Sequence, residues 1–581
     1  MKIKTVQIHN FRSIRDAKFN MGNYSLLVGE NNAGKTNILT ALRVLYDDIK
    51  FDEKRDFPKF SDVTDKESWI EAEYTLTNEE YYKLKKEYQG QGNTFRIRKY
   101  LKSESANYVK INQSNIYAYE NGKLSDNLFY GARNISQAKI GDLIYIPDVT
   151  KSDEALKLSG PSPFRNLLNY VIKKVISNSN SYRKLVRVFE EFNETFKSEE
   201  AERGISINSL IRDINLNIEE GWGIKFGIDI TPIQGEDIIK GLINYYIEDS
   251  NLDDKVDVND CGQGVQRYLI YTLITLVSKY QDVKFDSSEF NPDFTLILFE
   301  EPEAFLHPTQ QENLNLNLKE MSEADNVQLL ITTHSTTFVS QNIDDIPSIC
   351  KIKKLDGETK LYQLTKTELD NLYDENLSML KFLQDKLSDD KLDVSSKEQI
   401  KKMVNSENES IEDKLEMEFI RYLLWLDKER TAMFFADHIL LCEGASEKIF
   451  LDYLINTEWH DIRRKNVYIL DCMGKFNIGR YMNLLSKLGM SHSVLIDSDK
   501  NKKKKEIQEL FNSFIEKNKT DLTKGMYAFE DDFESFLGIN PPSSERKDLK
   551  PLNIMHKYKK GEISKEKLEE LRNILLENNL V

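Results

Sequence analysis

The chain has 581 residues, which is too long for one hydrophobic core and predicts two to four domains of roughly 150 residues each. Its composition, 40% hydrophobic and 30% charged, is that of a soluble globular protein, and its net charge of −16 disfavours tight, metal-free DNA binding. No apolar run is long enough to span a membrane, no secretory signal is visible, and the four scattered cysteines support neither a zinc site nor a disulfide framework, which fits a cytoplasmic location.

The first 150 residues have the patterns of a strand-rich lobe that contains one helix. Strand patterns cover residues 2–8, 24–28, 69–76 and 95–101. The apolar spacing over residues 37–46 predicts a helix directly after a glycine-containing loop. The alternating stretches favour an antiparallel sheet.

The remainder of the chain divides into four predicted regions. Residues 151–250 are mostly helical and polar, which suits an arm or a dimerisation insertion. Residues 251–365 contain two continuous apolar strands, typical of a parallel sheet that is covered on both faces. Residues 366–432 are a polar, helical or flexible connector, and residues 433–581 form a third β/α unit.

A phosphate-binding loop is predicted at residues 29–36, which match the pattern GxxxxGK[ST] between an apolar strand and a helix. Its glycines let backbone N–H groups close around phosphates, and the helix N-terminus adds a favourable dipole. The expected nucleotide-binding residues are Gly29, Asn32, Gly34, Lys35 and Thr36. Lys35 would pair with the β- and γ-phosphates of ATP, while Thr36 would coordinate Mg²⁺.

A second part of the nucleotide site is predicted where the apolar strand at residues 294–299 ends in two acids. Glu300 is assigned to the metal ion and Glu301 to polarising the attacking water. A glycine-rich helix start at residues 260–267 precedes this strand, and His334 follows the next strand.

Together these motifs resemble the ABC-type ATPases of the RecF, SMC and Rad50 group, and most of all the overcoming lysogenization defect (OLD) nucleases. The resemblance implies that Gly262 and Gly264 cap ATP bound to another subunit and that His334 senses the γ-phosphate. It also implies that Arg12 reaches the nucleotide. A buried structural histidine and a surface salt-bridge arginine are the alternatives.

Two departures from this group bear on hydrolysis. The metal-binding acid is Glu300, where many relatives have aspartate, and no glutamine loop is evident between Thr36 and Asp260. Slow hydrolysis or purely regulatory ATP binding is therefore compatible with the sequence.

A cluster of acids is predicted in the third β/α unit. Glu443 ends an apolar strand and is followed by a glycine turn into a helix that carries Glu447, while Asp497 and Asp499 end a later strand. The carboxyl ends of strands in an open α/β sheet gather functional groups, so these acids are expected to converge. Carboxylates are ligands for Mg²⁺ or Mn²⁺, and two such ions can cleave a phosphodiester.

This arrangement resembles the Toprim domain of topoisomerases, primases and OLD nucleases. The resemblance extends to Asp532 and Glu534 as further metal ligands and to a catalytic lysine, which is Lys550 with Lys547 as its competitor. Asp471, in a glycine-lysine turn, is either another ligand or only a turn-forming residue. A lysine run at residues 502–505 is either a DNA contact or a solvated loop.

The sequence as a whole predicts an α/β protein with an ABC-type ATPase head, a helical insertion and a C-terminal Toprim domain. Its predicted function is ATP-regulated cleavage or nicking of DNA with Mg²⁺ or Mn²⁺, as a homodimer or homotetramer away from membranes. The resemblance implies defence against phage, with a helicase or a reverse transcriptase as a companion protein. The alternatives are a non-cutting, SMC-like DNA clamp or sensor and, with less room in the chain, a topoisomerase or primase.

Overall fold

The computed structural model describes most of the chain, with its longest gaps in the middle. It covers residues 1–105, 107–132, 139–148, 179–196, 206–222, 290–339, 343–388, 429–498, 505–540 and 549–581, with shorter pieces between 199 and 272, between 394 and 401, and at 542. The predicted insertion at 151–250 and the connector at 366–432 thus lie partly outside the described residues.

The N-terminal lobe is a six-stranded antiparallel sheet, as the alternating sequence predicted. Its order is β2-β1-β4-β5-β6-β7, with bounds β1 (Lys2–Phe11), β2 (Ile14–Asn20), β4 (Ser68–Thr75), β5 (Thr94–Lys102), β6 (Ile116–Glu120) and β7 (Lys123–Leu128). Along β4, Ile70, Ala72 and Tyr74 face the core, because successive side chains of a strand alternate between faces. Short helices lie in the chain before, between or after these strands: α2 (Glu53–Asp56), α3 (Asn78–Lys83), η1 (Lys86–Tyr88) and η2 (Phe129–Gly131).

A second sheet forms the middle layer of the head. Its order is β14-β13-β3-β12-β11-β8, with bounds β3 (Tyr24–Gly29), β8 (Asp142–Ile146), β11 (Thr295–Glu300), β12 (Val327–Thr333), β13 (Ile349–Leu355) and β14 (Glu358–Tyr362). All strand pairs are parallel except the β13–β14 hairpin. Helix α1 (Lys35–Leu45) packs between the two sheets, and α9 (Pro308–Ser322) covers the opposite face. Both faces are buried, which explains the continuous apolar runs of β3, β11 and β12.

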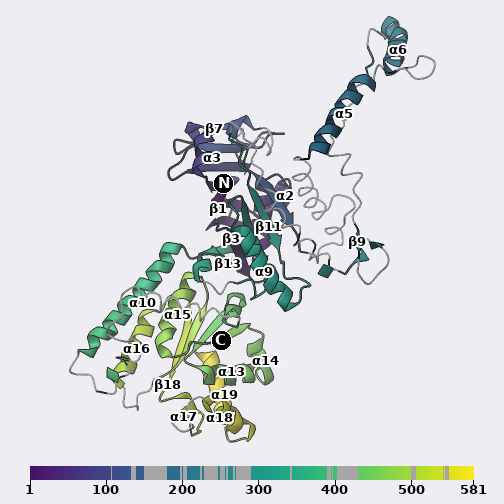
Figure 1. Cartoon of the computed structure of the whole chain (residues 1–581). Coiled ribbons are helices and arrows are strands. Elements are labelled where there is room, and N and C mark those ends of the chain that lie inside the picture. Colours follow the sequence, from purple (N-terminus) through teal and green to yellow (C-terminus); the bar gives the residue numbers. More distant parts are fainter. Residues whose placement is uncertain are drawn as a thin grey trace.

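The C-terminal unit is an all-parallel sheet of order β16-β15-β17-β18 (Figure 1). Its bounds are β15 (His438–Cys442), β16 (Val467–Asp471), β17 (His492–Asp497) and β18 (Thr523–Phe529). The helices are α13 (Ala445–Thr457), α14 (His460–Arg463), α15 (Lys475–Lys487), α16 (Lys505–Lys517), α17 (Phe533–Phe536), α18 (Lys550–Lys559) and α19 (Lys565–Glu577). Because the strands are parallel, their carboxyl ends meet at one edge, as predicted.

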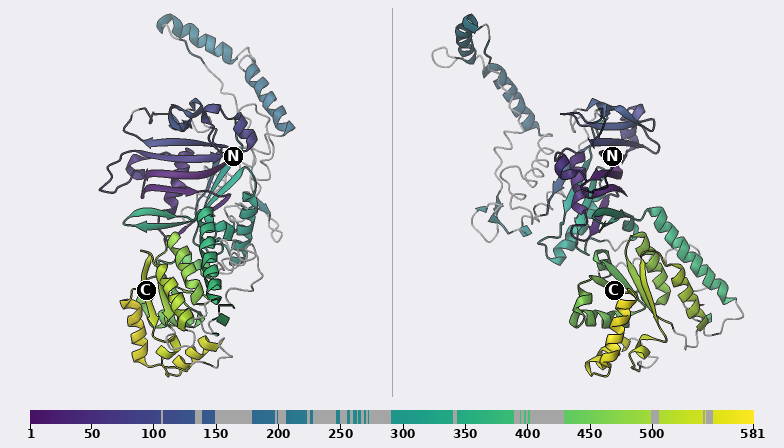
Figure 2. Two further views of the ribbon diagram at one scale, coloured as in Figure 1. Left: turned by 90° about the vertical axis from the view of Figure 1, so that its left-hand side faces the viewer. Right: turned by 180° about the vertical axis from the view of Figure 1, so that it is seen from behind.

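The other elements lie between or outside the sheets. These are α5 (Asn180–Phe196), α6 (Ile207–Trp222), β9 (Ile247–Glu248), β10 (Lys255–Val256), η6 (Ile343–Ser348), α10 (Lys366–Leu387) and η7 (Arg430–Phe435). Helices α5 and α6 stand away from the two sheets of the head and from the C-terminal sheet, whereas α10 runs beside α15 (Figures 1 and 2). No helix in the described ranges is both long and apolar enough to cross a membrane.

The head and the C-terminal unit share one hydrophobic core. That core joins Val28 and Leu329 of the middle sheet to Leu372 of α10 and to Leu441 and Tyr481 of the C-terminal unit. Polar contacts reinforce the junction. The buried ammonium of Lys351 on β13 donates to the carbonyl oxygen of Phe434, just before β15.

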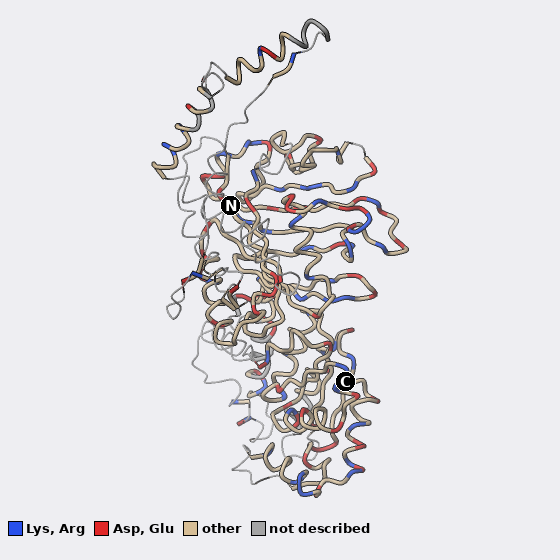
Figure 3. The backbone as a smooth tube through the Cα atoms, turned by 90° about the vertical axis from the view of Figure 1, so that its right-hand side faces the viewer, with Lys and Arg blue, Asp and Glu red and all other residues tan. Residues whose placement is uncertain are grey.

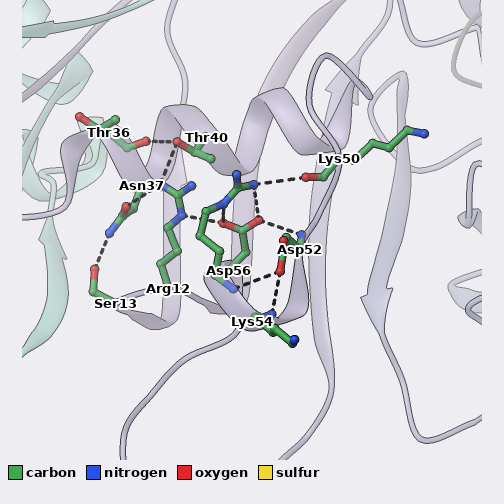
Figure 4. Close-up of polar contacts among 10 residues, drawn as sticks. Arg12, Ser13, Thr36, Asn37, Thr40, Lys50, Asp52, Lys54 and Asp56 are labelled. Carbon is green, nitrogen blue, oxygen red and sulfur yellow. Dashed lines mark hydrogen bonds and ion pairs between the residues drawn. The ribbon is translucent and has the colours of Figure 1, made fainter. Parts of the chain in front are cut away.

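A buried ion-pair network ties β1 to α1 and α2 beside the phosphate loop (Figure 4). The fully buried carboxylate of Asp56 accepts from Arg12 Nε at 2.9 Å and from two nitrogens of Arg55 at 2.8 Å. Burial raises the pKa of Asp56, but hydrogen bonds from Arg55, the Asp52 backbone and Arg12 outweigh burial and bring it to about 2. The network therefore stabilises the folded state only while Asp56 is ionised.

We predict that Asp56→Asn lowers the stability of the head by about 1–3 kcal/mol at neutral pH, because two arginines lose an ionised partner. The folded pKa lies below the ordinary value of 3.8, so this contribution is present above pH 4 and is lost as the pH falls toward 2. Thermal unfolding across this range should show the difference between wild type and variant shrinking with acidity. Asp62→Asn, which alters an exposed ion pair with Arg15, is the control and should change little; an equal effect there would contradict the prediction.

Candidate nucleotide-binding and metal-binding sites

The phosphate loop lies between β3 and α1, in the predicted strand–loop–helix context. The β13–β14 hairpin lies directly behind it. A Cβ atom at Gly29 would collide with the carbonyl oxygen of Ile352, and one at Gly34, where φ is 112°, with the Thr359 side chain. Both glycines are thus required for close packing as well as for access to phosphates.

The side chain of Lys35 lies within this loop. Its ammonium donates to the carbonyl oxygens of Gly29 and Glu30 at 2.8 and 2.9 Å. Burial lowers the pKa of Lys35 to about 8, although Glu301 and neighbouring acids act in the opposite direction. Asn32 is exposed in the same loop with a φ of 64°. The loop thus presents a buried cation at the start of a helix, which suits an anionic phosphate.

The predicted Mg²⁺ ligands Thr36 and Glu300 lie together. The Thr36 hydroxyl donates to Glu300 Oε1 at 2.6 Å, and the Tyr145 hydroxyl donates to Glu300 Oε2 at 2.6 Å. These are hard oxygen donors beside the phosphate loop, so they fit the cation that accompanies a nucleotide. Tyr145 was not predicted from the sequence.

Two acids that follow β11, Glu301 and Glu303, lie beside His334. His334 Nε2 lies 3.5 Å from Glu301 Oε1, and burial followed by the charge of Lys35 lowers the pKa of His334 to about 4. Burial, then Asp148, raises the pKa of Glu301. The His334 imidazole is therefore neutral near pH 7, beside an acid at the edge of the phosphate loop.

Glu303 shapes the loop that carries the histidine. Its Oε1 accepts from the Thr333 hydroxyl at 2.8 Å and from the backbone N–H groups of His334 and Ser335 at 2.5 and 3.1 Å. The carboxylate of Glu303 thus fixes the turn after β12. Glu303 and Asp148 were both missed as site residues by the sequence analysis.

Three predicted nucleotide-binding residues lie away from these contacts. Arg12 bonds Asn37 and Thr40 of α1 in addition to Asp56, so its guanidinium is anchored to the helix that follows the loop (Figure 4). Gly262 and Gly264 lie in short described pieces, and the nearest neighbour of a Cβ at Gly264 would be the Phe305 carbonyl oxygen at 3.9 Å. Their action on a second subunit stays a prediction.

In the C-terminal unit, the parallel strands β15 and β17 bring the side chain of Glu443 to the backbone of Asp497. Glu443 follows β15, and its Oε1 accepts from the backbone N–H of Asp497 at 2.8 Å, at the end of β17. The Lys475 ammonium lies 3.5 Å from Glu443 Oε1 and donates to the Asp497 carbonyl oxygen. Lys475 is buried at the start of α15, so it places a positive charge beside the carboxylate of Glu443 and the end of β17.

Glu447 and Glu534 lie near this pair. Glu447 is buried and accepts from the Gly444 N–H at 3.2 Å. Burial raises the pKa of Glu447 to about 7, with additional repulsion from Glu443 and Glu534. Glu534 is 2% exposed and pairs with the Lys550 ammonium at 2.8 Å, so acid and predicted catalytic lysine are neighbours.

The other predicted residues of this unit are less engaged. Asp532 accepts from Ser535 N at 2.9 Å as the N-cap of α17, and Asp471 accepts from Met473 N, which favours the turn-forming interpretation. Asp499, Lys547 and the lysine run at 502–505 lie outside the residues whose side chains the structure describes.

Hard oxygen donors at one sheet edge suit Mg²⁺ or Mn²⁺ in type. Across the described ranges, no three histidine, cysteine or acidic side chains lie close enough to hold an ion as they stand. Instead, Lys475 lies beside Glu443 and Lys550 forms an ion pair with Glu534. The acidic residues fit a divalent cation because their oxygens are hard ligands and their like charges repel one another without a cation. Binding of an ion would require the acids and the two lysines to reorient.

Comparisons with known proteins identify the domains that carry these two sites. Residues 1–339 match the AAA ATPase domain family, and residues 434–499 match the overcoming lysogenization defect protein-like TOPRIM domain. The Old nuclease of Escherichia phage P2 is 23% identical over 86% of this chain and 77% of its own length. The endonuclease GajA of Bacillus cereus (strain VD045) is 25% identical over 88% and 77%, and the OLD nuclease of Thermus scotoductus is 21% identical over 86% and 82%. The chain therefore belongs to the AAA ATPase domain family and carries an OLD-like TOPRIM domain in its C-terminal unit.

Proposed function

We propose that this protein is an ATP-regulated DNA endonuclease or nickase of the OLD family that depends on a divalent cation, Mg²⁺ or Mn²⁺. The observation that carries the proposal lies at the carboxyl edge of the C-terminal sheet. There Glu443 accepts a hydrogen bond from the backbone N–H of Asp497, and Glu447 and Glu534 lie near Glu443. The nuclease relatives, which span most of the chain, support the same reaction and DNA as the substrate.

The chain's own groups have distinct roles in this reaction. Bound divalent cations would lower the pKa of water and stabilise the leaving oxygen of a phosphodiester. Glu443, Glu447, Asp497 and Asp499 would hold the ions, with Asp532 and Glu534 as further ligands. Lys550 would then be released from Glu534 and could stabilise negative charge on the phosphate.

The head would bind ATP through Lys35, Thr36 and Glu300, with Glu301 polarising water and neutral His334 contacting the γ-phosphate. The fit of hydroxyl and carboxylate oxygens beside the loop supports this assignment. Five further points stay predictions: assembly into a dimer or tetramer, action of Gly262 and Gly264 on a second subunit, contact of Arg12 with the nucleotide, a companion helicase or reverse transcriptase, and a role against phage.

The nuclease proposal is tested with Glu443→Gln. This change removes a charge from the predicted metal site but keeps its shape, so plasmid cleavage with Mg²⁺ or Mn²⁺ should fall at least ~100-fold, whereas nucleotide binding should be retained. Chelation of the metal with EDTA should abolish cleavage by the wild type.

Glu570→Gln is the control, because Glu570 is an exposed acid on α19 that pairs with nearby Lys567. It should cleave at the wild-type rate. Cleavage by Glu443→Gln at the wild-type rate would contradict the nuclease proposal, and DNA binding without any cleavage by the wild type would favour the clamp alternative.

The nucleotide site is tested with Lys35→Ala. Loss of charge-assisted hydrogen bonds to phosphate should weaken ATP binding about 10- to 100-fold in titrations with a fluorescent ATP analogue. Lys18→Ala, on the exposed face of β2, should bind normally. Equal affinities for all three proteins would refute the phosphate-loop assignment.

A further inference from the structure

The carboxylate of Glu300 is held from two sides by hydroxyl groups. Thr36 donates to Oε1 from α1, and Tyr145 donates to Oε2 from β8, both at 2.6 Å. Strand β8 pairs with β11 in parallel, with Tyr145 opposite Leu298. Two residues far apart in the sequence thus fix both oxygens of one acid that is 3% exposed.

Tyr145 is itself held in place. The Arg43 guanidinium lies 3.8 Å from the centre of the Tyr145 ring, and Arg43 is fixed in turn by an ion pair with Asp48 at 2.6 Å. A phenol is protonated throughout the neutral range, so the Tyr145 hydroxyl is a hydrogen-bond donor to Glu300 there.

This arrangement matters because Glu300 is a glutamate. A glutamate has one more rotatable bond than an aspartate, so its carboxylate can point in more directions and loses more freedom on binding an ion. A hydrogen bond to Oε2 removes that freedom and leaves Oε1 on the side of Thr36. Groups that orient a metal-binding carboxylate in this way affect metal affinity without touching the metal.

We propose that Tyr145 is a positioning residue that orients Glu300 toward Thr36 for the cation bound with the nucleotide. The inference rests on the proposed ATP site of the head and does not depend on the nuclease activity of the C-terminal unit. Tyr145 contacts neither nucleotide nor water in this role. It acts only through Glu300.

The test is Tyr145→Phe, which removes one hydroxyl and keeps the ring on Arg43. Binding of a fluorescent ATP analogue is measured during titration with Mg²⁺ and, separately, in EDTA. The Mg²⁺ concentration for half-maximal enhancement should rise about 10- to 100-fold. Affinity in EDTA should stay within about twofold of the wild type, because Tyr145 does not contact the nucleotide.

Two further variants make the result specific. Tyr24→Phe removes a hydroxyl on β3 of the same sheet, which donates to Asn315 of α9. The Mg²⁺ requirement of this variant should be unchanged. In a Glu300→Asp background, which shortens the acid, Tyr145→Phe should cost much less than in the wild type. This double-mutant cycle reports coupling between the two side chains.

Each outcome discriminates. An unchanged Mg²⁺ requirement in Tyr145→Phe, an equal loss with and without Mg²⁺, or the same cost in both backgrounds would overturn the positioning role while leaving the ATP site intact. If the wild type binds no nucleotide under any condition, the proposed ATP site itself fails.

Discussion

Acidic side chains crowded together repel one another unless a cation lies near them or one of them is protonated, and this electrostatic constraint acts at both sites of the chain. In the head, Glu300, Glu301 and Glu303 all lie within electrostatic reach of the Lys35 ammonium. In the C-terminal unit, Glu443 and Glu534 are matched by Lys475 and Lys550. Unpaired charges of this kind would be too costly to bury.

The same constraint explains why the acids lie at strand ends. The interior of a parallel sheet is apolar on both faces, so the carboxyl edge is where a charged group can meet a helix N-terminus, a lysine or a metal ion. Figure 3 shows charged residues along the strands of the N-terminal sheet and on the connections. The buried strands β3, β11 and β12 of the middle layer carry one charged residue, Glu300 at the end of β11.

Much of this architecture was predictable because local patterns determine it. Continuous apolar runs identified β11 and β12 as buried parallel strands, and a glycine-rich loop between a strand and a helix located Lys35 and Thr36. The meeting of Glu443 with Asp497 followed from the rule that parallel strands end at one edge.

The residues that were missed depend on pairings that no local pattern encodes. Tyr145 reaches Glu300 only because β8 joins the sheet beside β11, 155 positions away in sequence. Thr359 packs on Gly34 through a hairpin more than 300 residues downstream of the loop. Lys475 was noted as part of a turn, but its contacts with Glu443 and with the Asp497 backbone depend on the positions of both strand ends.

The hydrophobic core shared by the head and the C-terminal unit has a consequence for how this architecture can evolve. Leu329, Leu372, Leu441 and Tyr481 pack into one apolar cluster, so each half presents an apolar surface toward the other. Recombination that exchanged one half for a distant homologue would leave mismatched apolar faces in contact with each other or with water. The two halves are therefore expected to diverge in step, as an inseparable pair of partners rather than as interchangeable modules.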